Sequence, residues 1–226
     1  MCRGVHTVRH ALAARPKLGN TLLSLVLSLG VIVGLAQTAD AITFAEVGDA
    51  GDLPGVSQAA GFLPVLTRIT GSVASSTDAD MFAITIGTAG LFSATTVGTP
   101  GTLTDTQLFF FNSSGVGLLA NDDSSGLRST LPGTAVSPGL YFLAISAWDR
   151  DPVSGGGLIF PTTPFSGVFG PTGPGGGSPI TGWGGSGGTG SYAIDLQLEP
   201  VPEPATLLLF GAALAGIGVA RRRLRG

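Results

Sequence analysis

The chain has 226 residues and a formal net charge of −3, but residues 42–204 alone carry 13 acidic and three basic residues, a net charge of −10. So acidic a segment repels phosphate backbones, which excludes a role in binding DNA or RNA. The same segment contains no His, Cys or Lys, which excludes Ser-His-Asp and Cys-His catalysis, Schiff-base chemistry, disulfide bonds and zinc sites of the His/Cys type.

The first 41 residues have the composition of an export signal. Basic residues occupy positions 3, 9, 15 and 17, an apolar run follows at 21–35, and Ala39-Asp40-Ala41 supplies the small-x-small pattern of a signal peptidase site. We therefore predict a signal peptide over 1–41, cleaved after Ala41, with cleavage after Ala39 as the second choice. An uncleaved N-terminal anchor is the alternative.

Residues 42–199 show no long helical periodicity and contain short runs of β-type composition separated by Gly, Pro, Asn, Asp and Ser. Phe82, Ile84 and Ile86 fall on one face of one such run, and alternate residues from Tyr192 to Leu198 do the same in another. This pattern predicts an all-β domain, a single antiparallel β-sandwich of jelly-roll or immunoglobulin-like type. The predicted strands are 42–47, 65–73, 80–86, 91–97, 106–112, 116–120, 139–147 and 190–198.

Two segments depart from simple alternation. Residues 108–111 are apolar on both faces, which predicts a central strand or one covered by a loop. Residues 152–190 hold 15 Gly and six Pro among 39 residues, a composition typical of a mobile loop. The apolar residues within this insert predict either docking on the sandwich or an adhesive outer surface.

The remaining residues, 200–226, have three parts. Val201-Pro202-Glu203-Pro204 is held extended and accessible by its prolines. The uncharged apolar run 205–220 predicts a transmembrane helix of about 24 Å, slightly short of a ~30 Å hydrocarbon core. The Arg cluster 221–225, with Arg221, Arg222 and Arg223 in succession, stops transfer and stays on the cytoplasmic side. An ordinary C-terminal anchor is the alternative.

This order of motif, helix and Arg cluster resembles the PEP-CTERM sorting signal of Gram-negative bacteria. The resemblance implies processing by the membrane enzyme exosortase at Pro202, Glu203 and Pro204. It also implies transient anchoring in the inner membrane, followed by a location at the cell surface or in the extracellular matrix.

The body carries a second resemblance. Asp78-Ala79-Asp80-Met81-Phe82, the hairpin 106–123, Pro138-Gly139-Leu140-Tyr141 and Gly190-Ser191-Tyr192 are similar, in this order, to motifs of the bacterial pre-peptidase C-terminal (PPC) domain. The resemblance implies a β-sandwich that serves as an accessory or binding module of a secreted protein, and some members bind calcium or matrix polymers. The Gly/Pro-rich insert 152–190 departs from the family pattern.

The acidic residues Glu46, Asp49, Asp78 and Asp80, with Asp52 nearby, are the candidate metal ligands. Calcium takes six to eight oxygen ligands, and alternate carboxylates on a loop can converge on one ion. The family resemblance implies that the first acidic segment lies beside Asp78 and Asp80 and shares an ion with them. The alternative is that Asp78 and Asp80 only make hydrogen bonds within a turn.

Other polar and aromatic residues have simpler interpretations. Asn121, Asp122 and Asp123 predict a hydrogen-bonded turn, with calcium as the alternative, and Asp149, Arg150 and Asp151 predict local ion pairing. Trp148 and Trp183 could stack on sugar rings, whereas Tyr141 and Tyr192 are expected in the core.

These observations favour a non-catalytic exported surface or matrix protein that associates with exopolysaccharide, with calcium as the one candidate cofactor. No catalytic residues are assigned. A small carboxylate-dependent glycosidase is one alternative, because paired carboxylates remain available for that chemistry. A purely structural accessory domain is the other.

Overall fold

The computed structural model describes residues 41–201 and residue 211. Within 41–201 the chain forms strands, turns and loops and contains no helix, which confirms the predicted all-β class. No helix of the described residues is long and apolar enough to cross a membrane. Several predictions lie outside the described residues. These are the signal peptide 1–41 except for Ala41, the processing residues Pro202, Glu203 and Pro204, the transmembrane span 205–220 except for Gly211, and the Arg cluster 221–225.

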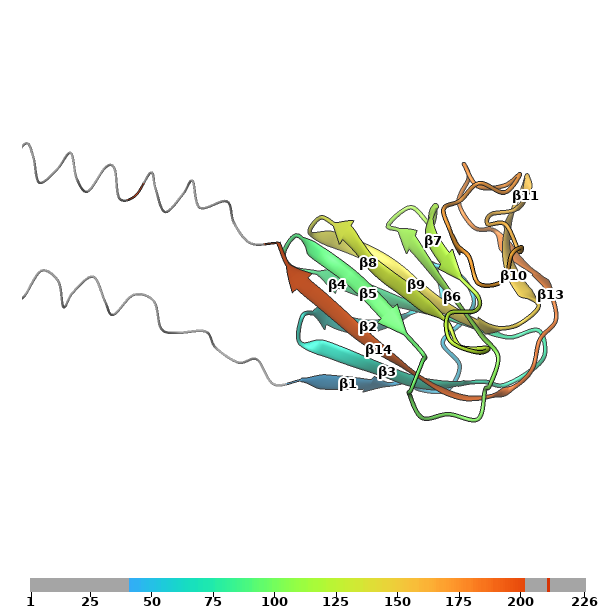
Figure 1. Ribbon diagram of the computed structural model, residues 1–226, viewed down its shortest axis with the longest axis horizontal. Helices are drawn as coiled ribbons and strands as arrows, with labels where there is room; N and C mark the ends of the chain where they lie inside the picture. The colour runs from blue at the N-terminus through green and yellow to red at the C-terminus, as the bar shows by residue number, and fades with distance from the viewer. Residues whose placement is uncertain (1–40, 202–210, 212–226) are drawn as a thin grey trace, which may run out of the picture. The chain divides into compact units, whose positions relative to one another are not determined.

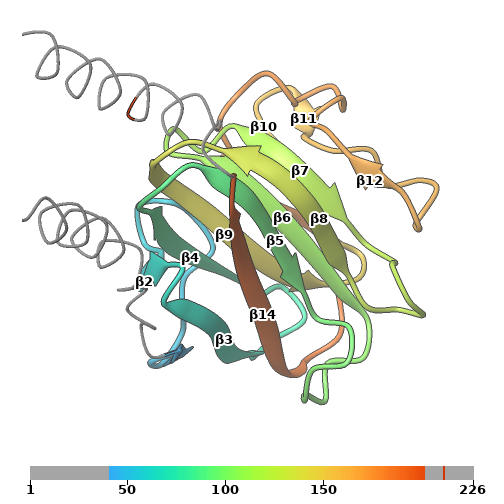
Figure 2. The ribbon, with the colours of Figure 1, turned by 60° about the vertical axis from the view of Figure 1, so that its left-hand side comes forward.

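Two large β-sheets face each other and form a sandwich (Figures 1 and 2). One sheet has five strands in the order β1-β3-β14-β5-β8, and the other has six in the order β12-β7-β6-β9-β4-β2. A small third sheet has the order β11-β10-β13. The strands are β1 (Ile42–Ala45), β2 (Gln58–Leu63), β3 (Leu66–Val73), β4 (Ala79–Ile86), β5 (Gly90–Thr95), β6 (Thr106–Asn112), β7 (Gly117–Asn121), β8 (Thr130–Val136), β9 (Gly139–Ala147), β10 (Arg150–Ser154), β11 (Gly157–Leu158), β12 (Val168–Phe169), β13 (Gly182–Gly185) and β14 (Gly190–Pro200).

All eight predicted strands are present, as β1, β3, β4, β5, β6, β7, β9 and β14. The structure differs from the expected fully antiparallel arrangement, because β1 pairs with β3 and β2 pairs with β4 in parallel. Strands β2 and β8 were not predicted. Gly61 interrupts the first, and Pro132 with Gly133 interrupts the second, so neither has a strand-like composition.

The main core lies between the two large sheets. Phe82, Ile84 and Ile86 of β4 pack there as predicted, together with Tyr192 and Ile194 of β14. Phe92 of β5 stacks on Phe110 of β6, with ring centroids 4.6 Å apart, so aromatic contacts join the two sheets.

A second core covers the outer face of the six-stranded sheet. Residues of β6 alternate between the two cores: Leu108 and Phe110 point into the main core, and Phe109 and Phe111 point outward. The insert covers these outward residues with Ile159, Phe160 and Ile180, each of which is buried.

The insert 152–190 is therefore packed on the sandwich and contributes β-structure, which corrects the expectation of a mobile loop. Strands β11, β12 and β13 lie within it: β12 is the edge strand of the six-stranded sheet, next to β7 (Figure 2), and β11 and β13 belong to the small third sheet. Residues 108–111 were predicted to form a central strand or one covered by a loop. In the structure both descriptions apply, because β6 lies between β7 and β9 and the insert covers its outer face.

Candidate functional site

The first acidic segment is attached to strand β3 through Glu46, which directly follows β1. The Oε1 atom of Glu46 accepts a hydrogen bond from the Ala50 amide at 2.9 Å, and its Oε2 atom accepts one from the Ser72 amide at 2.8 Å. Asp49 lies in the same segment and accepts a hydrogen bond from the Gly51 amide at 3.2 Å. Backbone amides thus hold Glu46 and Asp49 on one side of β3.

Asp80 reaches the same place from β4. Its side chain lies on the core-facing side of the strand, as Phe82 does, and is 0% exposed. The hydroxyl of Tyr192 on β14 donates a hydrogen bond to Asp80 Oδ2 at 2.7 Å. The other oxygen, Asp80 Oδ1, is buried and has no hydrogen-bond partner among the described residues.

Glu46, Asp49 and Asp80 each contribute one carboxylate oxygen to a group whose members lie within 4.8 Å of one another. The structure thus brings together three of the four residues predicted as metal ligands. The fourth, Asp78, accepts a hydrogen bond from the Ala74 amide at 2.5 Å, so it closes a turn. Asp78 therefore fits the turn interpretation, whereas Asp80 is one of the converging carboxylates.

The donor set fits a hard cation. Carboxylate oxygens are the ligands that calcium prefers, and Asp80 Oδ1 has no hydrogen-bond partner among the described residues that would compete for an ion. Burial raises the pKa of Asp80 to about 8, and the charges of Glu46 and Asp78 add to this shift against the opposing hydrogen bond from Tyr192. Asp80 is thus costly to ionise unless a positive charge lies beside it.

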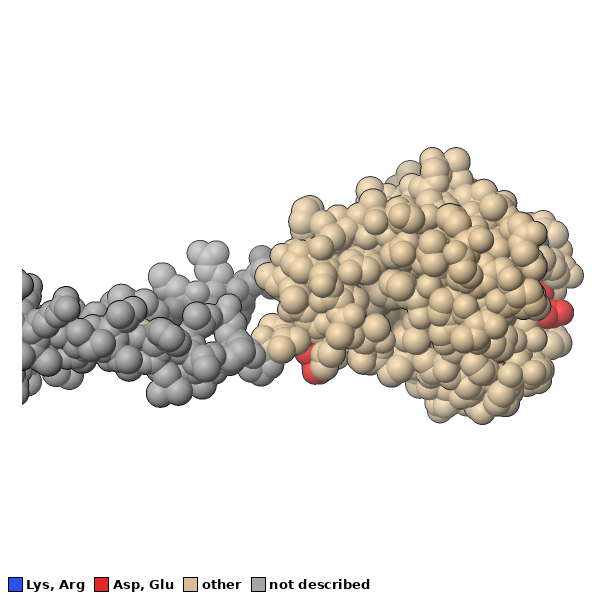
Figure 3. Space-filling view, turned by 90° about the horizontal axis from the view of Figure 1, so that it is seen from above, with Lys and Arg blue, Asp and Glu red and all other residues tan. Residues whose placement is uncertain are grey.

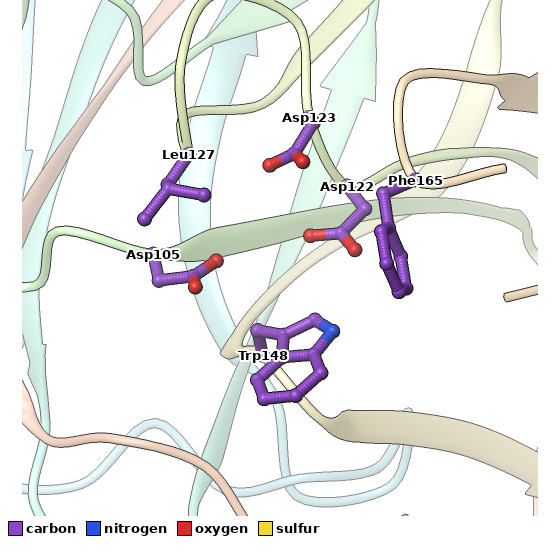
Figure 4. A pocket seen from close by; sticks show the side chains of 6 residues that line it. All are labelled: Asp105, Asp122, Asp123, Leu127, Trp148 and Phe165. Carbon is purple, nitrogen blue, oxygen red and sulfur yellow. The ribbon is translucent and has the colours of Figure 1, made fainter. Parts of the chain in front are cut away.

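A second group of carboxylates, at the ends of strands β6 and β7, consists of Asp105, Asp122 and Asp123. Asp105 precedes β6, whereas Asp122 and Asp123 follow β7. Strand pairing places them together, because Leu108 of β6 is opposite Asn121 of β7. The three side chains line a pocket of about 190 Å³ with Leu127, Trp148 and Phe165 (Figure 4).

Sequence reasoning did not single out Asp105. The signal that would have found it is the hairpin register: once β6 and β7 are paired, the residues that flank the open end of the hairpin must be neighbours. Asn121 does make the predicted turn hydrogen bonds, since its Nδ2 donates to the carbonyl of Asp123 at 3.2 Å.

The expected local ion pairing at 149–151 is not found. Arg150 extends to Asp52, with Nη2 and Oδ2 3.8 Å apart, and donates to the carbonyl of Trp183. Asp151 instead accepts a hydrogen bond from Gln107 Nε2 at 3.1 Å, and burial raises its pKa. The reason is strand pairing: Asp149 lies in the turn between β9 and β10, whereas Arg150 and Asp151 belong to β10, which pairs with β13 and directs Arg150 to the carbonyls of Trp183 and Gly185.

The aromatic residues divide by burial. Tyr192 is buried in the main core as predicted, and Tyr141 stacks partly buried on Phe110. Trp183 donates its indole N–H to the carbonyl of Asp52 at 2.8 Å and packs on the second core, so it is a structural residue. Trp148 is 45% exposed and lies at the Asp105 pocket.

Six of the 13 acidic residues of the body belong to these two groups of carboxylates. On the face shown in Figure 3, acidic side chains occupy small areas near the margins and no basic side chain is visible. Most of that face is uncharged. Broad uncharged surface lies between the acidic areas on this face.

Comparison with known proteins gives two findings. Residues 200–223 match the PEP-CTERM protein-sorting motif, and no curated protein matches the chain. A solved pre-peptidase C-terminal domain of a collagenase from Bacillus anthracis is similar at 11% sequence identity and a TM-score of 0.36, over 70% of this chain and 96% of that one. Each of the two resemblances noted in the sequence thus has a match among known proteins. The structural likeness is too low to carry an argument, so only the match to the sorting motif bears on function. The chain carries a PEP-CTERM protein-sorting motif at residues 200–223, the signal of an exosortase-sorted extracellular protein.

Proposed function

We propose that this exported protein acts without catalysis at the cell surface or in the extracellular matrix of a Gram-negative bacterium, where its β-sandwich associates with exopolysaccharide. The observation that carries the proposal is the sorting motif at 200–223, which directs the chain to exosortase. Signal peptidase acts at Ala41, and the inner membrane holds the protein until the C-terminal motif is processed.

The composition of the body supports a binding role. Residues 42–204 lack His, Cys and Lys, so nucleophilic or acid–base catalysis that depends on these side chains is missing there, and of the common hydrolytic mechanisms the carboxylate-dependent one remains. The body nevertheless presents a pocket with an exposed Trp and Phe, side chains that stack well on sugar rings.

We further propose that Glu46, Asp49 and Asp80 bind a calcium ion that stabilises the sandwich. The proposal is supported by the convergence of their oxygens within 4.8 Å and by the buried, unpartnered Asp80 Oδ1. An ion there would link β4, which carries Asp80, to the segment after β1, which carries Glu46 and Asp49 and is joined to β3 by the hydrogen bond from the Ser72 amide to Glu46. Calcium would thus act on stability, away from the Asp105 pocket.

The test is to incubate the exported protein, purified from its native host, with exopolysaccharide from the same host. We expect the protein to sediment with the polymer and no new reducing ends to appear over time. Reducing ends that accumulate would favour the glycosidase alternative, in which paired carboxylates cleave the polymer. If the protein neither sediments with the polymer nor cleaves it, the structural accessory domain is the correct description.

A further inference from the structure

The pocket at the open end of the β6–β7 hairpin combines two kinds of wall. Asp105, Asp122 and Asp123 form one side, and the rings of Trp148 and Phe165 form the other (Figure 4). Its volume of about 190 Å³ is below the roughly 300–1,000 Å³ of pockets for drug-sized ligands. The pocket therefore suits one small chemical unit, with any larger remainder of a ligand lying outside.

The acidic side of the pocket lacks compensating positive charge. Each of the three Asp residues has a buried Oδ1 atom without a hydrogen-bond partner among the described residues. The described residues form two ion pairs, Arg68–Asp195 and Arg150–Asp52, and neither includes these three carboxylates. Burial raises the pKa of Asp122 to about 7, with a further contribution from the neighbouring charges of Asp123 and Asp105. A cationic donor entering the pocket would satisfy these oxygens.

The aromatic side points to an organic ligand. Trp148 is 45% exposed and Phe165 is 44% exposed, although the two rings contact each other edge to face with centroids 6.2 Å apart. Exposed aromatic faces bind the apolar face of a ring and also attract a cation. A bare metal ion would use the carboxylates and leave the rings without a role. A ligand that joins an ammonium group to a ring uses both walls.

We propose that this pocket binds a protonated amino sugar, a hexosamine unit with a free primary amine, within a polysaccharide chain. This inference rests on the proposed function, since it names the chemical class of sugar that the exported protein recognises. The ammonium group donates to the carboxylates of Asp105, Asp122 and Asp123, and the sugar ring stacks on Trp148. Neutral or acetylated sugars offer these carboxylates only uncharged O–H or amide N–H donors, which form weaker hydrogen bonds than an ammonium group does.

The experiment is calorimetric titration of the exported protein at low ionic strength with a glucosamine tetramer and, separately, with the fully N-acetylated tetramer. The two ligands differ in charge and share the same sugar backbone. Charge-assisted hydrogen bonds are roughly twice as strong as neutral ones, so we expect at least about tenfold tighter binding of the free amine. Equal affinity for the two tetramers would overturn the proposal. So would equal affinity for a linear diamine, which has the charge without the ring, or binding of calcium at this pocket with no binding of the amine.

Variants locate the site. Asp122→Asn and Trp148→Ala should each weaken binding of the glucosamine tetramer by about tenfold. Glu199→Gln is the matched control for charge, because Glu199 is exposed at the end of β14 and does not line the pocket, and it should bind as the unaltered protein does. A melting temperature within a few degrees of that of the unaltered protein establishes that each variant is folded. Trp148→Phe keeps an aromatic ring and should therefore retain most of the binding of the glucosamine tetramer. Unchanged binding in both Asp122→Asn and Trp148→Ala would place the site elsewhere and overturn the proposal.

Failure of this inference is distinguishable from failure of the proposed function. If the host polymer retains the protein and both pocket variants equally well, association with exopolysaccharide stands and the pocket assignment is wrong. If the glucosamine tetramer binds but the host polymer does not retain the protein, the pocket assignment stands and the proposed association with that polymer is wrong.

Discussion

Asp80 carries a fully buried carboxylate, and in the part of the chain that the structure describes only one of its two oxygens is hydrogen-bonded. Its side chain is 0% exposed, one oxygen accepts from Tyr192, and the other has no partner among the described residues. A buried carboxylate in this state is stabilised either by a proton or by a cation. The choice between them depends on pH and on calcium, and both can be varied in solution.

We expect the stability of the protein in calcium-free buffer to fall as pH rises from about 4 to about 8. Burial raises the folded-state pKa of Asp80 to about 8 from the ordinary value of 3.8. Between these values the folded state binds more protons than the unfolded state, so the free energy of unfolding decreases with pH, by up to about 1.4 kcal/mol per pH unit. Thermal unfolding with a chelator present measures this slope. Asp80→Asn, which has no titratable group, should reduce it, and an equal slope in the variant would contradict the assignment.

Calcium should reverse this trend. Millimolar calcium should raise the melting temperature more at pH 8 than at pH 5, because the ion binds the ionised carboxylates and stabilises the folded state by mass action. Asp80→Asn should lose most of that increase. A melting temperature unmoved by calcium at pH 8 would exclude a tight site at Glu46, Asp49 and Asp80.

Gly71 tests the same site by sterics. A Cβ atom at this position would collide with Glu46 Oε2 and with the hydroxyl of Tyr192, so no larger residue fits without displacing both. We expect Gly71→Ala to cost about 1–3 kcal/mol of stability and to weaken the calcium response. Gly133→Ala is the control, because its Cβ would lie at an ordinary 3.7 Å from Leu91 Cβ. Denaturant unfolding of the two variants in parallel gives the comparison, and equal stability would argue against a tight fit at Gly71.

At the scale of elements, the insert and strand β6 depend on each other. Phe109 and Phe111 would be exposed on the outer sheet face without Ile159, Phe160 and Ile180 above them. A segment rich in Gly and Pro has a large unfolded entropy, and burial of these apolar side chains offsets it. The insert is therefore part of the folded domain.

Phe160→Ala should destabilise the protein by about 3–5 kcal/mol, because it opens a cavity in the second core. Phe62→Ala is the matched control: Phe62 is 59% exposed on β2, and the same truncation there should change stability by less than about 0.5 kcal/mol. Chemical denaturation measures both. Equal, small effects would show that the insert contributes little to folding.

At the scale of the whole molecule, the acidic body and the two terminal segments serve different purposes. The body carries a net charge of −10, whereas eight of the 11 basic residues lie in the termini. Basic residues next to an apolar run set orientation across a membrane, so this distribution of charge fits the proposed export and sorting of an acidic body.

Processing is tested on the complete protein in its host. Mass spectrometry of the surface or matrix fraction should find a species that lacks the residues before Ile42 and the apolar tail after the Pro202-Glu203-Pro204 motif. Replacing Pro202 and Pro204 together with Ala should retain the tail and keep the protein with the inner membrane. An unaltered protein recovered from the cytosol and still ending at Gly226 would contradict the sorting assignment.

The sequence by itself determined the all-β class, eight of the strands, the face that Phe82, Ile84 and Ile86 bury, and the sorting motif. These features are local: alternation with a period of two and the order of a short motif are written in neighbouring residues. The resemblance of the body to a known family also led to the expectation that Glu46 and Asp49 lie near Asp80, and the carboxylates of these three residues do converge; calcium binding there stays a prediction.

Only the tertiary structure decided the rest. Strands β2 and β8 form because neighbouring strands pair with them, although Gly61 and Pro132 weaken their local signal. The insert is packed because the outer face of β6 requires cover, and Asp105 meets Asp122 and Asp123 because hairpin pairing brings distant residues together. Contacts between residues far apart in the chain depend on strand register and on burial, and no run of neighbouring residues records either of them.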